Sequence, residues 1–237
     1  MESAYEGDGK LSRRERERLM RRRAMLNAAK AVFAEKGYAN ATLDEIAERA
    51  EFGKGTLYNY FEEGKEEILF AIFDELYDDL YAIIQDSFGD VAVPDGLSLR
   101  EAYHRFVVES FEFFMEQEDL FLILVKEAYQ LAFSNNANHV DYFHRQQERM
   151  VGGLAPALEE AMDSQSVHTL PVRSTAYMML ENLTGLLVHR ASLASNAHGA
   201  SPKEGYADAL TSHPEQAADF LTTVFFDGLG VEPSADR

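Results

Sequence analysis

Residues 41–61 read ATLDEIAERAEFGKGTLYNYF, and this stretch decides the fold. Thr42 is followed three residues later by Glu45, which is the spacing of a capping box, so a helix is expected to begin directly after Thr42. Apolar residues then recur at helical spacing. Residues 51–53 break this pattern, and a second, short helix is expected over residues 54–60. Two short helices joined by a three-residue turn that contains glycine are typical of a helix-turn-helix.

The second helix opens with a cation, a residue without a side chain and a hydroxyl, which are Lys54, Gly55 and Thr56. These groups suit a helix N-terminus that meets a phosphate or the edge of a base. The run KGTLYNYF at residues 54–61, followed by GKEEIL at residues 64–69, resembles the DNA-binding domain of the tetracycline-repressor (TetR) family. The resemblance extends over roughly residues 20–73.

Three residues depart from the pattern of that family. Glu51 stands where the family usually has glycine in the turn, and Gly53 stands where it usually has serine as the helix N-cap. Gly64 replaces a usual serine before Lys65. Glycine is an acceptable N-cap, although it supplies no side-chain acceptor.

The resemblance implies an all-α fold of about nine helices. It implies an N-terminal tail and helix-turn-helix DNA-binding domain at residues 1–66, and a helical effector-binding and dimerisation domain at residues 67–237. Thr42 and Lys65 open helices, where backbone amides favour an anion, so both are expected to touch phosphate. The other residues expected to bind DNA in this domain are Lys54, Gly55, Thr56, Tyr58, Asn59 and Tyr60.

The segment before this domain is rich in arginine. Residues 11–23 contain seven Arg and two Glu. One interpretation is a solvated helix extension, because Glu17 and Arg21 form a favourable i, i+4 pair. The other is a basic arm that contacts phosphates or enters a minor groove. The excess of arginine favours DNA contact, and the residues predicted to make it are Arg21, Arg22 and Arg23.

The formal net charge of the 237 residues is −19, and it is unevenly distributed. Residues 1–70 hold 13 Lys and Arg against 14 Asp and Glu, whereas residues 71–237 hold 9 against 27. The first part is therefore near neutral with a basic segment, and the second is strongly acidic. The absence of cysteine excludes disulfides, thiolate zinc sites and cysteine nucleophiles.

The sequence has no run of about 18 apolar residues and no apolar segment of a signal peptide near its N-terminus, so the protein is expected in the cytoplasm. It lacks serine-hydrolase, phosphate-loop and dinucleotide motifs, and it is expected to be neither an enzyme nor a cofactor protein.

Two alternatives to a ligand-responsive regulator stay open. A carboxylate-bridged metal enzyme is suggested by two carboxylate-x-x-His units, although Glu101 already belongs to a capping box with Ser98. The residues of that alternative are Glu101, His104, Asp141 and His144, with Glu127 or Glu181 as further ligands. The second alternative is an architectural DNA-binding protein without a ligand, although such a protein does not need a large apolar C-terminal domain.

The last two predicted helices, near residues 172–194 and 214–229, carry more apolar surface than one side of a helix requires. The family resemblance implies that they pair with their symmetry mates in a homodimer. The residues predicted for this interface are Met179, Leu183, Leu186, Phe220, Leu221, Val224 and Phe225.

The predicted helices between these and the DNA-binding domain are rich in aromatic residues. An effector pocket would be mainly apolar with a few polar groups. The candidates to line it are His104, Phe106, Phe113, Phe121, Tyr129, Phe143, Gln147, Met178, Asn182 and His189. These residue types suggest an apolar or amphipathic effector, and the resemblance implies a repressor that this effector releases from a palindromic operator.

Overall fold

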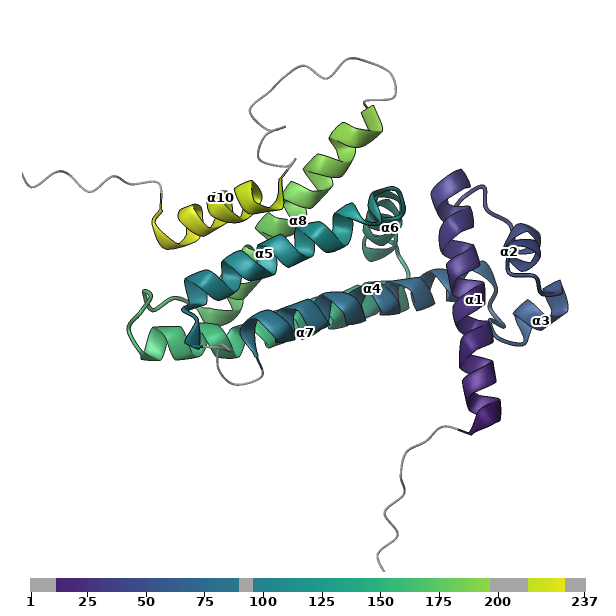
Figure 1. Ribbon diagram of the computed structural model, residues 1–237, viewed down its shortest axis with the longest axis horizontal. Helices are drawn as coiled ribbons and strands as arrows, with labels where there is room; N and C mark the ends of the chain where they lie inside the picture. The colour runs from purple at the N-terminus through teal and green to yellow at the C-terminus, as the bar shows by residue number, and fades with distance from the viewer. Residues whose placement is uncertain (1–11, 90–95, 197–212, 229–237) are drawn as a thin grey trace, which may run out of the picture. The chain divides into compact units, whose positions relative to one another are not determined.

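The computed structural model describes residues 12–89, 96–196 and 213–228, and all regular structure in these ranges is helical, as predicted. In chain order (Figure 1), the helices are α1 (Arg13–Lys36), α2 (Leu43–Arg49), α3 (Lys54–Tyr58), α4 (Lys65–Phe88), α5 (Leu99–Met115), α6 (Glu118–Ala132), α7 (Ala137–Asp163), α8 (Val172–Asn196) and α10 (Pro214–Phe226). None of the described helices has the length and hydropathy needed to cross a lipid bilayer.

The chain divides into two compact units, Met1–Asp74 and Glu75–Arg237. The division falls inside α4, whereas the sequence analysis placed it before residue 67. The first part of α4 lies in the first unit, where Ile68 and Leu69 are fully buried. The predicted N-terminal tail at residues 1–10 lies outside the described residues.

The first unit is built on the long helix α1. Ser12 and Glu15 form a capping box at its start, and Gly37, at φ +74°, follows its end. The side chains of Phe33 in α1, Ile46 in α2 and Leu57 in α3 are fully buried. Their burial removes apolar surface from water and fixes the two short helices of the helix-turn-helix within this unit.

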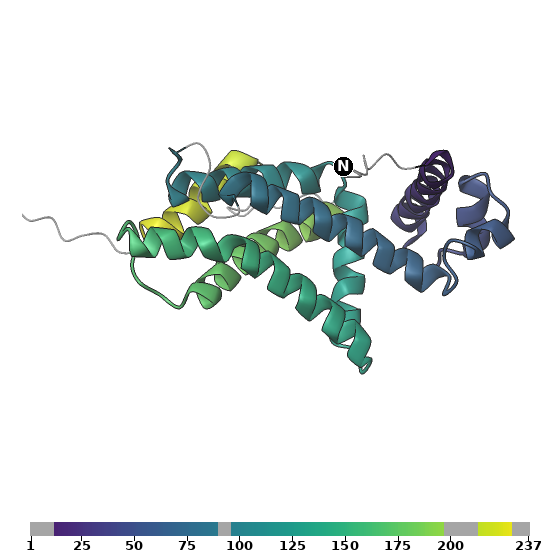
Figure 2. The same ribbon diagram turned by 90° about the horizontal axis from the view of Figure 1, so that it is seen from below.

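The second unit packs α5 against α10 and α8 against α6 and α7. Helix α6 is seen nearly end-on in Figure 1 and lengthwise in Figure 2, so it runs across the direction of α5. The core is aromatic, and the hydroxyl of Tyr103 in α5 donates to the carbonyl of Met179 in α8 at 3.1 Å. Burial raises the pKa of Tyr103 above its ordinary value, so the hydroxyl keeps its proton as a donor.

A glycine brings two helices of this unit close together. A Cβ on Gly153 of α7 would lie 2.8 Å from the Cγ2 of Ile84 in α4 and 3.1 Å from the ring of Tyr81. Real Cβ atoms essentially never come as close as the first of these distances, so only glycine fits here without movement. Arg149 of α7 reinforces the crossing, since it pairs with Asp78 of α4 at 2.7 Å.

Candidate nucleic-acid interface

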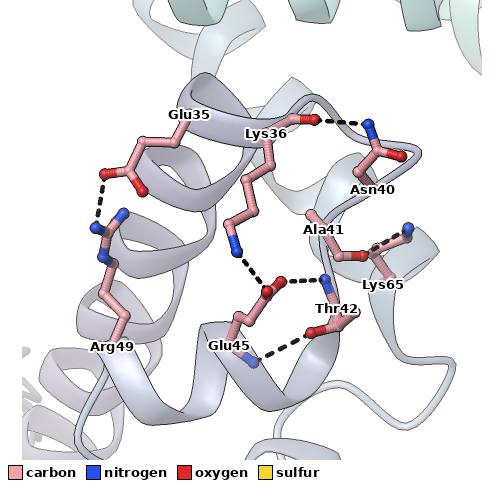
Figure 3. Close-up of polar contacts among 8 residues, drawn as sticks. All are labelled: Glu35, Lys36, Asn40, Ala41, Thr42, Glu45, Arg49 and Lys65. Atoms are coloured by element: carbon pink, nitrogen blue, oxygen red, sulfur yellow. Dashed lines mark hydrogen bonds and ion pairs between the residues drawn. The ribbon is translucent and has the colours of Figure 1, made fainter.

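The capping box predicted at the start of α2 is present (Figure 3). The Thr42 side chain accepts from the Glu45 amide at 3.3 Å, and the Glu45 carboxylate accepts from the Thr42 amide at 3.0 Å. Lys36, at the end of α1, donates to the same carboxylate. The Lys36 ammonium and then the Thr42 hydrogen bonds lower the pKa of Glu45 to about 2. The start of α2 is therefore tied to the end of α1.

The turn between α2 and α3 forms although Glu51 stands where the TetR family usually has glycine. Glu51 adopts φ +60°, the left-handed conformation in which glycine meets no penalty and other residues lose about 1–2 kcal/mol. The amide of the next residue, Phe52, donates to the carbonyl of Ala47 at 2.9 Å. Gly53 then caps α3 without a side-chain hydrogen bond, as the sequence indicated.

Helix α3 is shorter than predicted, ending at Tyr58 rather than near Tyr60. The amide of Asn59 is shared between the carbonyls of Gly55 and Thr56, and that of Tyr60 donates to Leu57, three residues back, so the last turn tightens and the helix stops. Leu57 anchors α3 in the core. Most of the residues predicted to meet DNA lie on the outside: Lys54, Gly55, Tyr58 and Asn59 are exposed, and Thr56 and Tyr60 are half-buried.

Lys54 has an internal partner that the sequence analysis missed. Its ammonium donates to the carboxylate of Asp44 in α2 at 2.9 Å. This hydrogen bond raises the pKa of Lys54 above its ordinary value. Both side chains are largely exposed, so a phosphate can compete with Asp44 for the ammonium.

The ammonium of Lys65 is hydrogen-bonded within the first unit. This limits the phosphate contact predicted for Lys65 to its backbone amide. It donates to the carbonyls of Tyr38 at 2.7 Å and Ala41 at 2.9 Å, and it lies 4.5 Å from the centroid of the Tyr38 ring (Figure 3 shows the bond to Ala41). These carbonyls belong to the loop between α1 and α2. The predicted phosphate contact therefore stays a prediction for the backbone amide of Lys65 and not for its ammonium.

The three arginines predicted as a basic arm do not all lie on one side of their helix. They belong to α1, which runs without a break from Arg13. Arg21 and Arg23 are exposed, whereas Arg22 is half-buried with its guanidinium 5.3 Å from the centroid of the Phe61 ring. Successive residues of a helix lie 100° apart, so Arg21 and Arg23 occupy different sides.

The ten residues predicted for the effector pocket do not gather around one cavity. Phe106, Phe121 and Phe143 are buried in the core of the second unit. Phe113 and Gln147 are half-buried, whereas Tyr129, Met178, Asn182 and His189 are exposed. His104 faces the carboxylates of α10, at 3.1 Å from Asp219 and 3.7 Å from Glu215.

Six of the seven residues predicted for the dimer interface are buried or half-buried within a single chain, so their place in an interface stays a prediction. Met179 and Leu183 of α8 are 2% and 4% exposed within a single chain. Leu221 is also buried, and Leu186, Val224 and Phe225 are half-buried. Phe220 alone of the seven is exposed, at 41%. Tyr177, Met178, Asn182 and His189 are among the exposed residues of α8. Three of these four, Met178, Asn182 and His189, were predicted for the pocket.

A small apolar hollow in the second unit was not foreseen from the sequence. It is lined by Phe114, Met115, Glu118, Phe121, Leu187 and Arg190. The nearest charged groups, Glu118 and Arg190, form an ion pair at 3.3 Å. Of its residues, only Phe121 was among the pocket candidates, because helical spacing does not show which helices meet.

The residues of the metal-enzyme alternative are not brought together. Glu101 is engaged in its capping box with Ser98, and Asp141 pairs with Arg145 at 3.0 Å. Within the described ranges, no group of three or more His, Asp or Glu side chains is arranged to hold a metal ion.

These features define a helix-turn-helix DNA-binding protein with a larger helical second unit. Residues 25–72 match the family described as "Bacterial regulatory proteins, tetR family". This match and the helical fold make the chain similar to the TetR-family transcriptional regulators.

Three comparisons place the chain among known proteins. It is 25% identical over 177 residues to the uncharacterized HTH-type transcriptional regulator YhgD of Bacillus subtilis, covering 70% of this chain and 82% of YhgD. It is 32% identical over 81 residues to the HTH-type transcriptional repressor DhaR of a Mycobacterium species, covering 34% of this chain and 40% of DhaR. The structure of the regulator FadR from Bacillus subtilis in complex with stearoyl-CoA shares the fold, with a TM-score of 0.64, 19% identity, and coverage of 88% of this chain and 99% of FadR.

Proposed function

We propose that this protein is a homodimeric repressor that binds a palindromic operator and is released from it by an apolar or amphipathic effector. The observation that carries the DNA-binding part is the surface of α3. Leu57 is fully buried, while the adjacent Tyr58 is 41% exposed and Asn59 is exposed beside it. An anchored helix with polar and aromatic groups on its outer side suits entry into a major groove.

The dimer would form through the exposed sides of α8 and α10. Two apolar side chains support this proposal, because Met178 of α8 is 52% exposed and Phe220 of α10 is 41% exposed. The two helices contact each other in the second unit. A protein that reads two half-sites with one helix-turn-helix per chain needs a two-fold partner, whose recognition helix would lie about 34–36 Å away.

The effector would bind in the second unit. Its core is aromatic, and the hollow beside Phe114, Phe121 and Leu187 has apolar walls with the Glu118–Arg190 ion pair among its lining residues. These residue types match a ligand with an apolar part and a charged part, and the hollow would have to widen to admit one. The complex of FadR with stearoyl-CoA supports an acyl compound as the first candidate.

Helix α4 would couple effector binding in the second unit to DNA binding by the first unit. It is a single helix from Lys65 to Phe88, and it contributes to both units. In the second unit it is held against α7 at Gly153 and through the Asp78–Arg149 pair. An effector that prefers one arrangement of α4 over another would shift the population of DNA-binding dimers by its difference in affinity for the two.

The test of this function is selection of bound DNA from a random pool. The wild type should enrich inverted repeats, and Tyr58→Ala should lower the ratio of operator to random-DNA affinity by roughly 5- to 150-fold, the equivalent of about 1–3 kcal/mol per base contact. Phe133→Ala removes an exposed aromatic from the second unit and serves as the matched control, which should enrich the same sequences. A wild type that binds random and enriched DNA equally would favour the architectural alternative.

A further inference from the structure

The N-terminal half of α1 extends beyond the core of the first unit. Its first buried residue is Met25, twelve residues after the helix begins at Arg13. The side chains between them are exposed, apart from half-buried Arg22. Twelve residues make about 18 Å of helix. Burial of apolar surface does not explain this length, yet the Ser12–Glu15 capping box defines where the helix starts.

This extension is strongly basic. It carries seven Arg and two Glu, and both Glu have local partners. Glu15 bonds to Ser12 in the capping box, and Glu17 pairs with Arg13 at 2.8 Å. The two carboxylates neutralise only a small part of the positive charge of the seven arginines. The extension is therefore strongly positive in a protein whose net charge is −19.

The arginines divide between two sides of α1. At 100° per residue, Arg14, Arg18 and Arg21 fall within about 60° of one another, and Arg22 lies next to them. We call Arg14, Arg18, Arg21 and Arg22 the basic stripe. Arg16 and Arg23 lie about 140–180° away from its first three members around the helix.

The basic stripe continues the side of α1 that packs into the core. Met25, Ala29 and Val32 are buried and follow the stripe at helical spacing. Two aromatic residues that come directly after α3 meet the stripe: the Arg18 guanidinium lies 5.7 Å from the centroid of the Tyr60 ring, and that of Arg22 lies 5.3 Å from the centroid of the Phe61 ring. The stripe is therefore fixed beside the C-terminal end of the recognition helix.

Stacked guanidinium groups are well suited to hold phosphate. A guanidinium that rests with its face on a ring keeps its in-plane N–H groups for hydrogen bonds, and it loses less rotational freedom on binding because it is already positioned. Its planar fork matches the oxygens of a phosphate.

We infer that the basic stripe is a second DNA-binding surface, which holds backbone phosphates next to the bases contacted by α3. This inference rests on the proposed DNA binding by α3. The stripe adds affinity without sequence information and lengthens each half-site, because 18 Å of helix corresponds to about 5 base pairs of duplex at 3.4 Å each.

Two double variants of equal charge change test the stripe. Arg14→Gln with Arg21→Gln removes two stripe residues that take part in neither ring contact, and Arg16→Gln with Arg23→Gln removes two exposed arginines from the other side. Glutamine preserves helix propensity, so helical circular dichroism should be the same for both. Each variant is titrated with the selected operator, once with and once without 5 flanking base pairs on each side, over a series of salt concentrations.

The stripe variant should bind the flanked operator at least tenfold more weakly than wild type, and the flanking base pairs should raise its affinity less than they raise that of wild type. Its log–log salt slope should fall by about 1.8 per monomer for two lost phosphate contacts. The control variant should stay within twofold of wild type. The inference is overturned if both variants lose affinity equally, or if trimming leaves wild-type binding unchanged.

Two further outcomes separate the explanations. Vesicles containing anionic phospholipid are titrated in parallel; if the stripe variant loses binding only to them, the stripe is a membrane surface and the inference fails. If the wild type selects no operator at all, the proposed function has failed; the two double variants are then compared on random duplexes, and equal affinities there overturn the inference about the stripe as well.

Discussion

Asp44 neutralises the ammonium of Lys54 at the start of the recognition helix. The 2.9 Å pair is exposed, so it contributes at most about 1 kcal/mol, and a DNA phosphate must displace the carboxylate to reach Lys54. The acidic partner therefore lowers affinity for all DNA. It limits non-specific binding most, because random DNA is bound through phosphates.

We predict that Asp44→Asn strengthens binding to random DNA by up to about fivefold and raises operator affinity less. The specificity ratio should therefore fall. Fluorescence anisotropy at one fixed salt concentration measures both affinities. Glu35→Gln is the control, since it removes the same charge from the Glu35–Arg49 pair of the same unit. An equal gain for Glu35→Gln would mean that net charge matters and the contact to Lys54 does not.

The sequence predicts hydrogen bonds between residues within one helical turn. It does not predict hydrogen bonds between a side chain and carbonyl groups far away in the chain. The capping box of Thr42 and Glu45 was recognisable because both partners lie within one helical turn. The position of Glu51 was also recognisable, and its positive φ follows from the turn. The carbonyls that hold Lys65 come from 24 to 27 residues earlier, and no spacing rule connects them.

At the scale of helices, two adjacent apolar residues of α8 lie on different sides of the helix, one exposed and one buried. Met178 is 52% exposed and Met179 is 2% exposed. Met178→Asp should leave a folded monomer, because an exposed carboxylate costs little until a second chain covers it. Met179→Asp should lower the free energy of unfolding by several kcal/mol, because it buries an unpaired charge. Sedimentation and thermal unfolding distinguish the two, and a dimeric Met178→Asp with unchanged operator affinity would refute the α8 interface.

The sequence could not distinguish the buried side of α8 from its exposed side, for a physical reason. Helical periodicity reports that both sides of α8 are apolar, but the choice between core and interface depends on which helices pack nearby. The contact of Tyr103 with the carbonyl of Met179 decides it, and this contact joins residues 76 positions apart. In contrast, the existence and type of the long helices follow from sequence alone.

At the scale of the whole molecule, the net charge of the residues that are proposed to bind DNA differs strongly from that of the residues that are proposed to bind the effector. Residues 71–237 carry a net charge of −18, and residues 1–70 carry −1. The acidic part repels DNA over roughly 8 Å at physiological salt, so the chain can bind DNA well only through the surfaces of its first unit. Added salt screens this repulsion, which raises the affinity for DNA. Added salt also weakens the phosphate contacts, which lowers the affinity. Affinities are therefore comparable only at one stated salt concentration.

We propose that an effector bound in the second unit controls DNA binding by the first unit. Operator affinity measured with and without saturating stearoyl-CoA tests it most directly, with free CoA as the control. We expect at least tenfold weaker operator binding with stearoyl-CoA, and an equal loss of stearoyl-CoA affinity when operator is bound, because coupling between two sites is reciprocal. Stearoyl-CoA that binds the dimer and leaves operator affinity unchanged would contradict it.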